Sequence, residues 1–316
     1  MPSDNPFIDC WYLTGATATG KSGTALALAR QLDAEIVSLD SMAIYRGMDI
    51  GTAKPTPQQQ ALVPHHLIDI VDPQGEFSVA QYRERADEVV AAIRQRGRTP
   101  LFVGGTPLYL KALLRGLFEG PPADWQLRQQ VAEEVEQVGA AALHRHLQEI
   151  DPVAASTIHP NDTRRLIRAL EVYRATGQPI SHQQMEFDDG VPAERRRVFV
   201  LRRERDEHYH RINARVDEML RRGLVDEVRG LTADGRQLGR TASQAVGYRE
   251  VIAHLSGEWD YDTMVAKIKT RTRQFAKRQG TWFRSLSECR FVDIAGEPDT
   301  EKLAEQIAAA GREVDL

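Results

Sequence analysis

The 316-residue sequence has little cysteine and no long apolar segment. Its two cysteines, Cys10 and Cys289, are too few and too far apart for a disulfide framework or a metal-ligand cluster. No apolar run approaches the roughly 20 residues that a membrane span needs. The first residues also lack the basic and apolar regions of a secretory signal, so we expect a cytoplasmic protein with no membrane partner.

The charge is small overall but unevenly distributed. The chain has 41 Lys and Arg, 45 Asp and Glu, and a net charge of −4. Residues 191–290 hold 22 of the basic and 14 of the acidic residues, a net of +8, which leaves 19 against 31, a net of −12, for the remainder. A local basic excess is expected of a protein that binds a polyanion, although a solvated helical surface produces it too.

Short apolar runs alternate with helical patterns in the first 120 residues. We expect strands at residues 7–13, 34–39 and 100–103, and a helix over residues 79–96. This alternation predicts a parallel α/β sheet. The following segment is helical until a strand at residues 198–201, after which long basic helices are expected over residues 206–222 and 261–285.

Together with the Gly-x4-Gly-Lys-Ser pattern at residues 15–22, these patterns predict an α/β fold with a P-loop NTPase-like parallel sheet core and a mostly helical insertion domain. Residues 1–120 and 196–316 would form the core, with the basic helices in its C-terminal part, and residues 121–195 would form the insertion. A length of 316 residues accommodates such a core and its insert.

The most specific short motif is a phosphate-binding loop. The pattern Gly-x4-Gly-Lys-Ser stands between an expected strand and an expected helix. Glycines let backbone amides turn toward an anion, Lys21 adds a positive charge, and Ser22 can reach a magnesium ion. We therefore assign diphosphate or nucleotide binding to Gly15, Ala16, Thr17, Ala18, Thr19, Gly20, Lys21 and Ser22.

Two motifs typical of nucleotide hydrolases are missing. The strand at residues 100–103 ends in Gly-Gly-Thr106, without the acid of a Walker B motif, and the chain has no Asn-Lys-x-Asp sequence. Both absences argue against an ATPase or a GTPase. Asp40 follows the second strand, where a carboxylate is expected near the P-loop, and the alternative is that it caps a helix.

Basic clusters occur in three places. Arg164, Arg165 and Arg168 lie on one expected helix, residues 244–249 form a loop-like stretch, and the helix over residues 261–285 carries seven basic residues. For any one arginine, a solvated position is the alternative to a contact with a ligand. The nine histidines show no metal-binding spacing.

Longer blocks of the sequence resemble the bacterial tRNA dimethylallyltransferases. They run in order from about residue 10 to residue 285, and the block at residues 40–55 is much more specific than a P-loop alone. Ala16 stands where this family usually has proline, and Gln244 where some members have arginine. The matching blocks are residues 15–22, 40–55, 64–70, 103–109, 159–173, 243–249 and 271–279.

The resemblance implies transfer of a dimethylallyl group from dimethylallyl diphosphate to the exocyclic N6 amine of an adenosine. That adenosine lies immediately 3′ of the anticodon in tRNAs that read codons beginning with U. The P-loop would then hold the departing diphosphate, with Lys21 and a Mg²⁺ ion on Ser22 stabilising its charge. Asp40 would orient the amine and take its proton, with Thr106 beside the reacting centre.

An adenine in the anticodon loop must leave its stack to reach such a site. By resemblance, the tRNA-binding positions are Asp40, Ser41, Met42, Ala43, Thr106, Arg128, Arg164, Arg165, Leu166, Ile167, Arg168, Gln244, Ala245, Val246, Gly247, Tyr248 and Arg249. We expect a monomer that binds the anticodon stem-loop of tRNA. A small P-loop metabolite kinase and a non-catalytic RNA-binding module are the alternatives.

Overall fold

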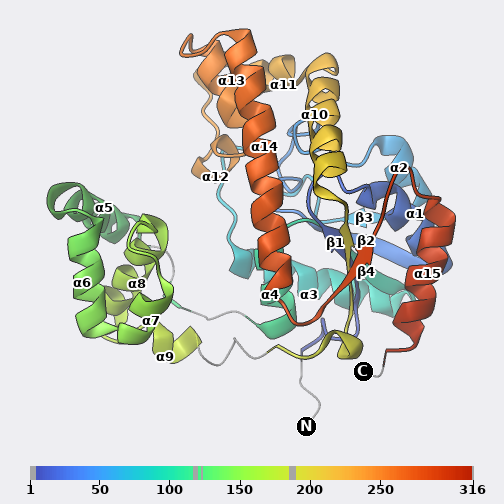
Figure 1. The fold of residues 1–316 in the computed structure, drawn as a ribbon, viewed down its shortest axis with the longest axis horizontal. Helices are drawn as coiled ribbons and strands as arrows, with labels where there is room; N and C mark the ends of the chain where they lie inside the picture. Colours follow the sequence, from blue (N-terminus) through green and yellow to red (C-terminus); the bar gives the residue numbers. More distant parts are fainter. Residues whose placement is uncertain (1–4, 117–119, 122–123, 185–189, 315–316) are drawn as a thin grey trace. The chain divides into compact units, whose positions relative to one another are not determined.

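The computed structural model describes residues 5–116, 120–121, 124–184 and 190–314 (Figure 1). Two compact units are present, one formed by residues 1–114 and 191–316 and the other by residues 115–190. The second unit thus starts and ends several residues earlier than the insertion predicted at residues 121–195. The reason at its start is that α4 (Pro107–Arg115) packs against the sheet as far as Leu114, and the chain leaves the core there.

The first unit contains a six-stranded sheet in which every pairing is parallel, as predicted. β1 lies inside the sheet, between β4 and β5, and Leu13 is in register with Val103 and Phe199. In spatial order the strands are β3 (His65–His66), β2 (Ala34–Leu39), β4 (Thr99–Gly104), β1 (Trp11–Gly15), β5 (Arg197–Arg202) and β6 (Cys289–Asp293).

Helices cover both faces of this sheet, so that the strands read as almost continuous apolar runs. Tyr12 points to the face that packs against α3 (Val79–Gln95) and α4. Its neighbours Trp11 and Leu13 point to the opposite face, which is covered by α1 (Lys21–Gln31) and α15 (Thr300–Arg312). Figure 1 shows α1 and α15 side by side.

A third apolar cluster encloses the segment after β2, in which Ile44, Tyr45 and Met48 are fully buried. Helices from the C-terminal part of the chain surround it, and α10 and α14 run alongside each other (Figure 1). Both basic helices are therefore found where they were predicted. The helices of this region and its neighbours are α2 (Pro57–Leu62), α10 (Arg205–Arg221), α11 (Leu224–Leu231), α12 (Arg240–Ser243), α13 (Tyr248–Leu255) and α14 (Tyr261–Arg284).

The second unit is helical and has its own core, which includes the buried side chains of Val131, Leu147 and Leu170. Aspartate side chains cap three of its helices at Asp124, Asp151 and Asp162. No helix in the described ranges combines the length and the apolar character that a bilayer crossing requires. The helices are α5 (Trp125–Val138), α6 (Ala140–Ile150), α7 (Pro152–Thr157), α8 (Thr163–Thr176) and α9 (Ser181–Gln184).

Candidate active site

Three of the predicted segments meet at the carboxyl ends of neighbouring strands. β1 leads into the P-loop, β2 into Asp40 and β4 into Thr106, and parallel strands end at the same edge of a sheet. The Thr106 hydroxyl oxygen accepts the backbone N–H of Ser41 at 3.1 Å, and the Thr106 N–H donates to the Leu39 carbonyl at 3.1 Å. Thr106 is therefore in direct contact with the segment that begins at Asp40.

The P-loop has the backbone conformation that its glycines suggest. Gly20 takes a φ of +98° and Ala18 a φ of +63°, both left-handed, and such turns aim successive N–H groups at one point. The Lys21 ammonium lies 2.8 Å from the Gly15 carbonyl oxygen and 2.7 Å from that of Ala16. The pKa of Lys21 is lowered to about 7, chiefly by burial and also by the positive charge of Arg215, while the Asp40 carboxylate opposes both effects.

Helix α10 and the residue before its N-cap bring further cationic and polar groups to the P-loop. The Arg203 guanidinium donates from Nε to the Thr19 carbonyl at 3.1 Å, and the His208 Nε2 lies 2.7 Å from the Thr17 carbonyl. Burial lowers the pKa of Arg215, and Asp40 acts against this change. Sequence reasoning missed Arg203, His208 and Arg215, because this segment contains many basic residues. Only tertiary packing decides which of them face the P-loop.

Asp40 lies near the P-loop, and it does not cap a helix, because the residues that follow it form a turn. Its Oδ1 accepts the N–H groups of Met42 at 2.8 Å and Ala43 at 3.3 Å and so closes this turn. The carboxylate charge also acts on Lys21 and Arg215. Both backbone bonds end on Oδ1, and neither of them engages Oδ2.

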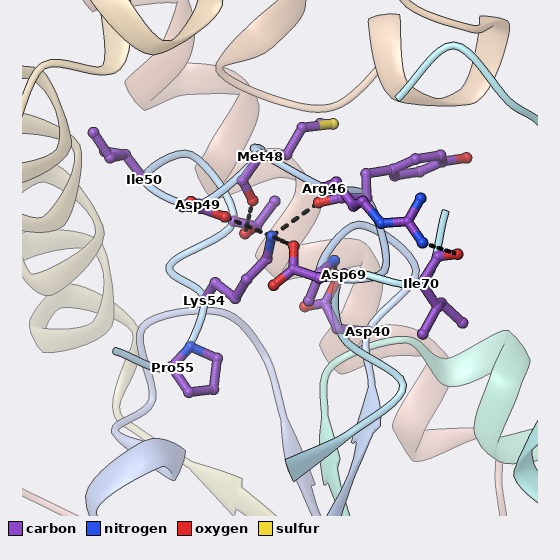
Figure 2. A network of polar contacts seen from close by, with 12 residues as sticks. Asp40, Arg46, Met48, Asp49, Ile50, Lys54, Pro55, Asp69 and Ile70 are labelled. Atoms are coloured by element: carbon purple, nitrogen blue, oxygen red, sulfur yellow. Dashed lines mark hydrogen bonds and ion pairs between the residues drawn. The ribbon is translucent and has the colours of Figure 1, made fainter. Parts of the chain in front are cut away.

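A buried lysine fixes the segment that follows Asp40. The Lys54 ammonium lies 2.5 Å from Asp49 Oδ1, 2.6 Å from Asp69 Oδ1 and 2.8 Å from the Tyr45 carbonyl (Figure 2). Its side chain is 3% exposed. All three donor positions of the ammonium are thus used within the protein, which indicates that Lys54 shapes the segment.

Glu227 holds the same segment from α11. Its carboxylate accepts the backbone N–H groups of three consecutive residues, Asp49 at 3.0 Å, Ile50 at 2.7 Å and Gly51 at 3.2 Å. It also accepts the Tyr248 hydroxyl at 2.6 Å. Tyr248 is fully buried, so its side chain supports the segment at residues 49–51 and does not present an aromatic face to RNA.

The stretch at residues 244–249 is only partly a loop, which corrects the sequence interpretation. Helix α13 already begins at Tyr248, because Gly247 takes a φ of +98° and its N–H is accepted by the buried Glu250 carboxylate at 2.7 Å. Arg271 forms an ion pair with the same carboxylate. Of the six predicted positions, Gln244 and Arg249 are exposed, Val246 is half-buried, and Ala245, Gly247 and Tyr248 are buried.

The predicted arginines of the helical unit have different environments. Arg128 Nε and Arg168 Nη1 both contact Oε2 of the fully buried Glu171, at 2.9 and 2.8 Å. Arg164 and Arg165 are both exposed, and Arg165 pairs with Asp162 at 3.4 Å. Leu166 is fully buried and Ile167 packs against the core of this unit, so the Leu166 side chain does not reach the surface.

Ser22 suits the magnesium ion that was predicted for it. It lies exposed in the first turn of α1, directly after Lys21, so its hydroxyl is open to an ion that also contacts a bound diphosphate. Mg²⁺ prefers oxygen ligands and is usually held by few protein groups together with substrate phosphates. An exposed serine hydroxyl at the P-loop fits this pattern.

The parallel sheet, the P-loop on an inner strand and the surrounding cations define a protein of the P-loop class. Comparisons with known proteins narrow this class. The model of the IPP transferase family matches residues 43–286, and a tRNA dimethylallyltransferase of Rhodopirellula baltica is 47% identical over 95% of this chain and 93% of its own length. The chain belongs to the IPP transferase family and is a transferase.

Solved structures agree with this assignment. The full-length tRNA isopentenylpyrophosphate transferase of Bacillus halodurans shares 39% identity and a TM-score of 0.68, with 96% of this chain and 97% of that chain covered. A eukaryotic dimethylallyltransferase, described as acting on tRNA, has a TM-score of 0.78 at 26% identity and covers 95% of this chain and 77% of its own. These likenesses confirm the P-loop NTPase-like fold.

Proposed function

We propose that this protein transfers a dimethylallyl group from dimethylallyl diphosphate to the N6 amine of the adenosine 3′-adjacent to the anticodon. The substrates would be tRNAs that read codons beginning with U. The observation that carries the proposal is the placement of a P-loop lined with cations and of Asp40 and Thr106 on neighbouring strand ends. A leaving diphosphate needs the P-loop and its cations. An amine that loses a proton needs the Asp40 and Thr106 side of the site.

The P-loop side of the site would act on the leaving diphosphate, and the Asp40 side would act on the amine. The carbon–oxygen bond of the allylic diphosphate breaks, and the charge that grows on the diphosphate is stabilised by Lys21, Arg215 and the P-loop amides. A Mg²⁺ ion on Ser22 would supply a further positive charge to the diphosphate. The N6 lone pair forms the new bond to carbon, and Asp40 Oδ2 takes the N6 proton.

Binding of the tRNA would involve both units. Gln244 and Arg249 are exposed in the first unit, and Arg164 in the second, so these side chains are open to RNA phosphates and bases. We expect a monomer as the active species. Size-exclusion chromatography with light scattering tests that state.

The transfer assay tests the activity directly. Purified protein, MgCl₂ and dimethylallyl diphosphate labelled in the allyl group are incubated with an unmodified tRNA that carries adenosine at the proposed position. We expect label in the RNA and N6-dimethylallyladenosine in its digest. The matched tRNA with guanosine at that position should remain unlabelled.

The kinase alternative is tested in the same reaction. The strand that precedes Thr106 supplies no acid for a nucleotide-bound metal, and the comparisons do not favour a kinase. ATP consumption without transfer of label would refute the proposed function. Transfer of label without added ATP would exclude the need for a phosphoryl donor.

A further inference from the structure

The side chain of Gln279 connects the P-loop to the loop that carries Thr106. Gln279 lies on α14 and is 5% exposed. Its Oε1 accepts the Thr17 N–H at 3.0 Å, and its Nε2 donates to the Gly105 carbonyl at 2.5 Å. A single amide thus bonds to two backbone segments that are separated by almost 90 residues of chain.

The chemistry of these partners fixes the orientation of the amide. A backbone N–H can only donate, and a carbonyl oxygen can only accept, so Oε1 must face Thr17 and Nε2 must face Gly105. Only an amide satisfies both partners at this position. A carboxylate would keep the first bond and place an oxygen against the Gly105 carbonyl.

Gly105 makes this close approach possible. A Cβ at this position would lie 2.6 Å from Gln279 Nε2 and 3.1 Å from the Gly15 carbonyl oxygen. Any side chain would therefore displace either the glutamine or the P-loop backbone. The glycine lets the helix, the P-loop and the loop after β4 come together without an intervening side chain.

The bonds continue from Gly105 to the proposed base. Thr106 follows Gly105 directly, its hydroxyl oxygen accepts the Ser41 N–H at 3.1 Å, and Ser41 is next to Asp40. Gln279 is thereby one link in a continuous path from the P-loop to the carboxylate. The opposite side of Thr17 is held as well, since His208 contacts its carbonyl.

We propose that Gln279 is a positioning residue that sets the distance between the diphosphate site and the Thr106–Asp40 side of the active site. The inference rests on the proposed function. Transfer requires the allylic carbon to lie between the leaving diphosphate and the attacking amine, and small errors in such an alignment cost orders of magnitude in rate. Gln279 contributes to turnover through the two loops that it connects.

Two substitutions remove the bonds in different ways. Gln279→Met keeps the length of the side chain and removes both hydrogen bonds, whereas Gln279→Glu keeps the acceptor for Thr17 and removes the donor for Gly105. Gln274 is an exposed glutamine on the same helix, so Gln274→Met and Gln274→Glu are the matched controls.

We expect kcat at saturating dimethylallyl diphosphate and tRNA to fall at least tenfold in both Gln279 variants. The Kd for tRNA should stay within threefold of the unaltered protein, and the Gln274 variants should keep normal kcat. A normal kcat in folded Gln279→Glu would overturn the inference. Activity of the unaltered protein tests the proposed function separately, so failure of one is distinguishable from failure of the other.

A double-mutant cycle separates positioning from a general loss of stability. If Gln279 acts through the Thr106 loop, Gln279→Met should cost less than threefold in kcat when added to Thr106→Ala. The inference would be overturned if the double variant lost the full product of the two single-variant losses in kcat. Circular dichroism melting of each variant identifies any that does not fold. If Gln279→Met does not fold, the kcat of Gln279→Glu decides the inference.

Discussion

The ammonium of Lys21 is bonded to the carbonyl oxygen of Gly15, 2.8 Å away at the other end of the same loop. A second bond goes to Ala16 at 2.7 Å. The lysine therefore interacts with carbonyl dipoles of its own P-loop. A diphosphate would replace these weak acceptors with a stronger, charged one, which couples binding to the protonation state of Lys21.

Binding of dimethylallyl diphosphate should weaken as the pH rises above 7. The pKa of Lys21 is about 7 in the free protein, chiefly because of burial, and a bound diphosphate favours the charged form and raises it. Above the free pKa the lysine must take up a proton on binding, so the affinity falls by up to about tenfold per pH unit. Isothermal titration calorimetry between pH 6.5 and 8.5, without tRNA, measures this slope.

Lys21→Arg is the control for that experiment, because an arginine stays charged throughout the range. The affinity of the Lys21→Arg variant for dimethylallyl diphosphate should change with pH only through ionisation of the diphosphate itself. Equal pH dependence in the two proteins would show that Lys21 does not titrate as expected.

Substitutions at Asp40 should separate its two roles. Asp40→Asn retains an oxygen that can accept the Met42 and Ala43 N–H groups but removes the base, so we expect kcat to fall about 10²-fold or more with a Kd for tRNA within threefold. Asp40→Ala should also lose about 1 kcal/mol of stability, because the hydrogen bonds that close the turn are removed. Single-turnover transfer and urea unfolding measure the two effects.

Activity of Asp40→Asn near the normal level would contradict a role in proton transfer. The carboxylate would then serve only to hold the backbone at residues 42 and 43.

Parts of this site could be predicted from sequence because their signal is local. The P-loop is encoded by eight consecutive residues, and Asp40 and Thr106 directly follow apolar strands whose ends must meet. Gln279 and Arg215 were not predicted as site residues, since each lies on a long polar helix among similar side chains. Only the packing of α14 and α10 against the P-loop decides which residues face it.

The same reason explains why some of the predicted RNA-binding positions have buried side chains. Tyr248 and Leu166 lie in segments that resemble tRNA-binding blocks, yet both are fully buried. A motif includes the residues that support a surface as well as those that form it. The distinction depends on burial, which the pattern of residues does not reveal.

Glu171 should be important for the stability of the helical unit. Its carboxylate is fully buried, contacts the guanidinium groups of Arg128 and Arg168, and accepts the Asp124 N–H, so Glu171→Gln removes a buried negative charge that two arginines contact. Breaking a buried ion pair costs about 3 kcal/mol or more. Hydrogen exchange of α5 and α8 in the full chain should therefore become much faster.

The matched control is Glu134→Gln. Glu134 pairs with Arg174 between the same two helices, but the Glu134 side chain is 40% exposed, whereas that of Glu171 is fully buried. An exposed pair contributes about 0–1 kcal/mol. Similar losses for the two substitutions would contradict the importance of the buried carboxylate.

Arg164 is a better probe of RNA contact in this unit than Arg128 or Arg168. Removing either of the latter disturbs the buried Glu171, whereas Arg164 is exposed. Arg164→Ala should weaken tRNA binding by a similar factor for all bound tRNAs and reduce the slope of log K against log salt by about 1. Filter binding between 50 and 300 mM KCl measures the slope, with Arg174→Ala as the control. An unchanged slope would make Arg164 a solvated residue that does not contact a phosphate.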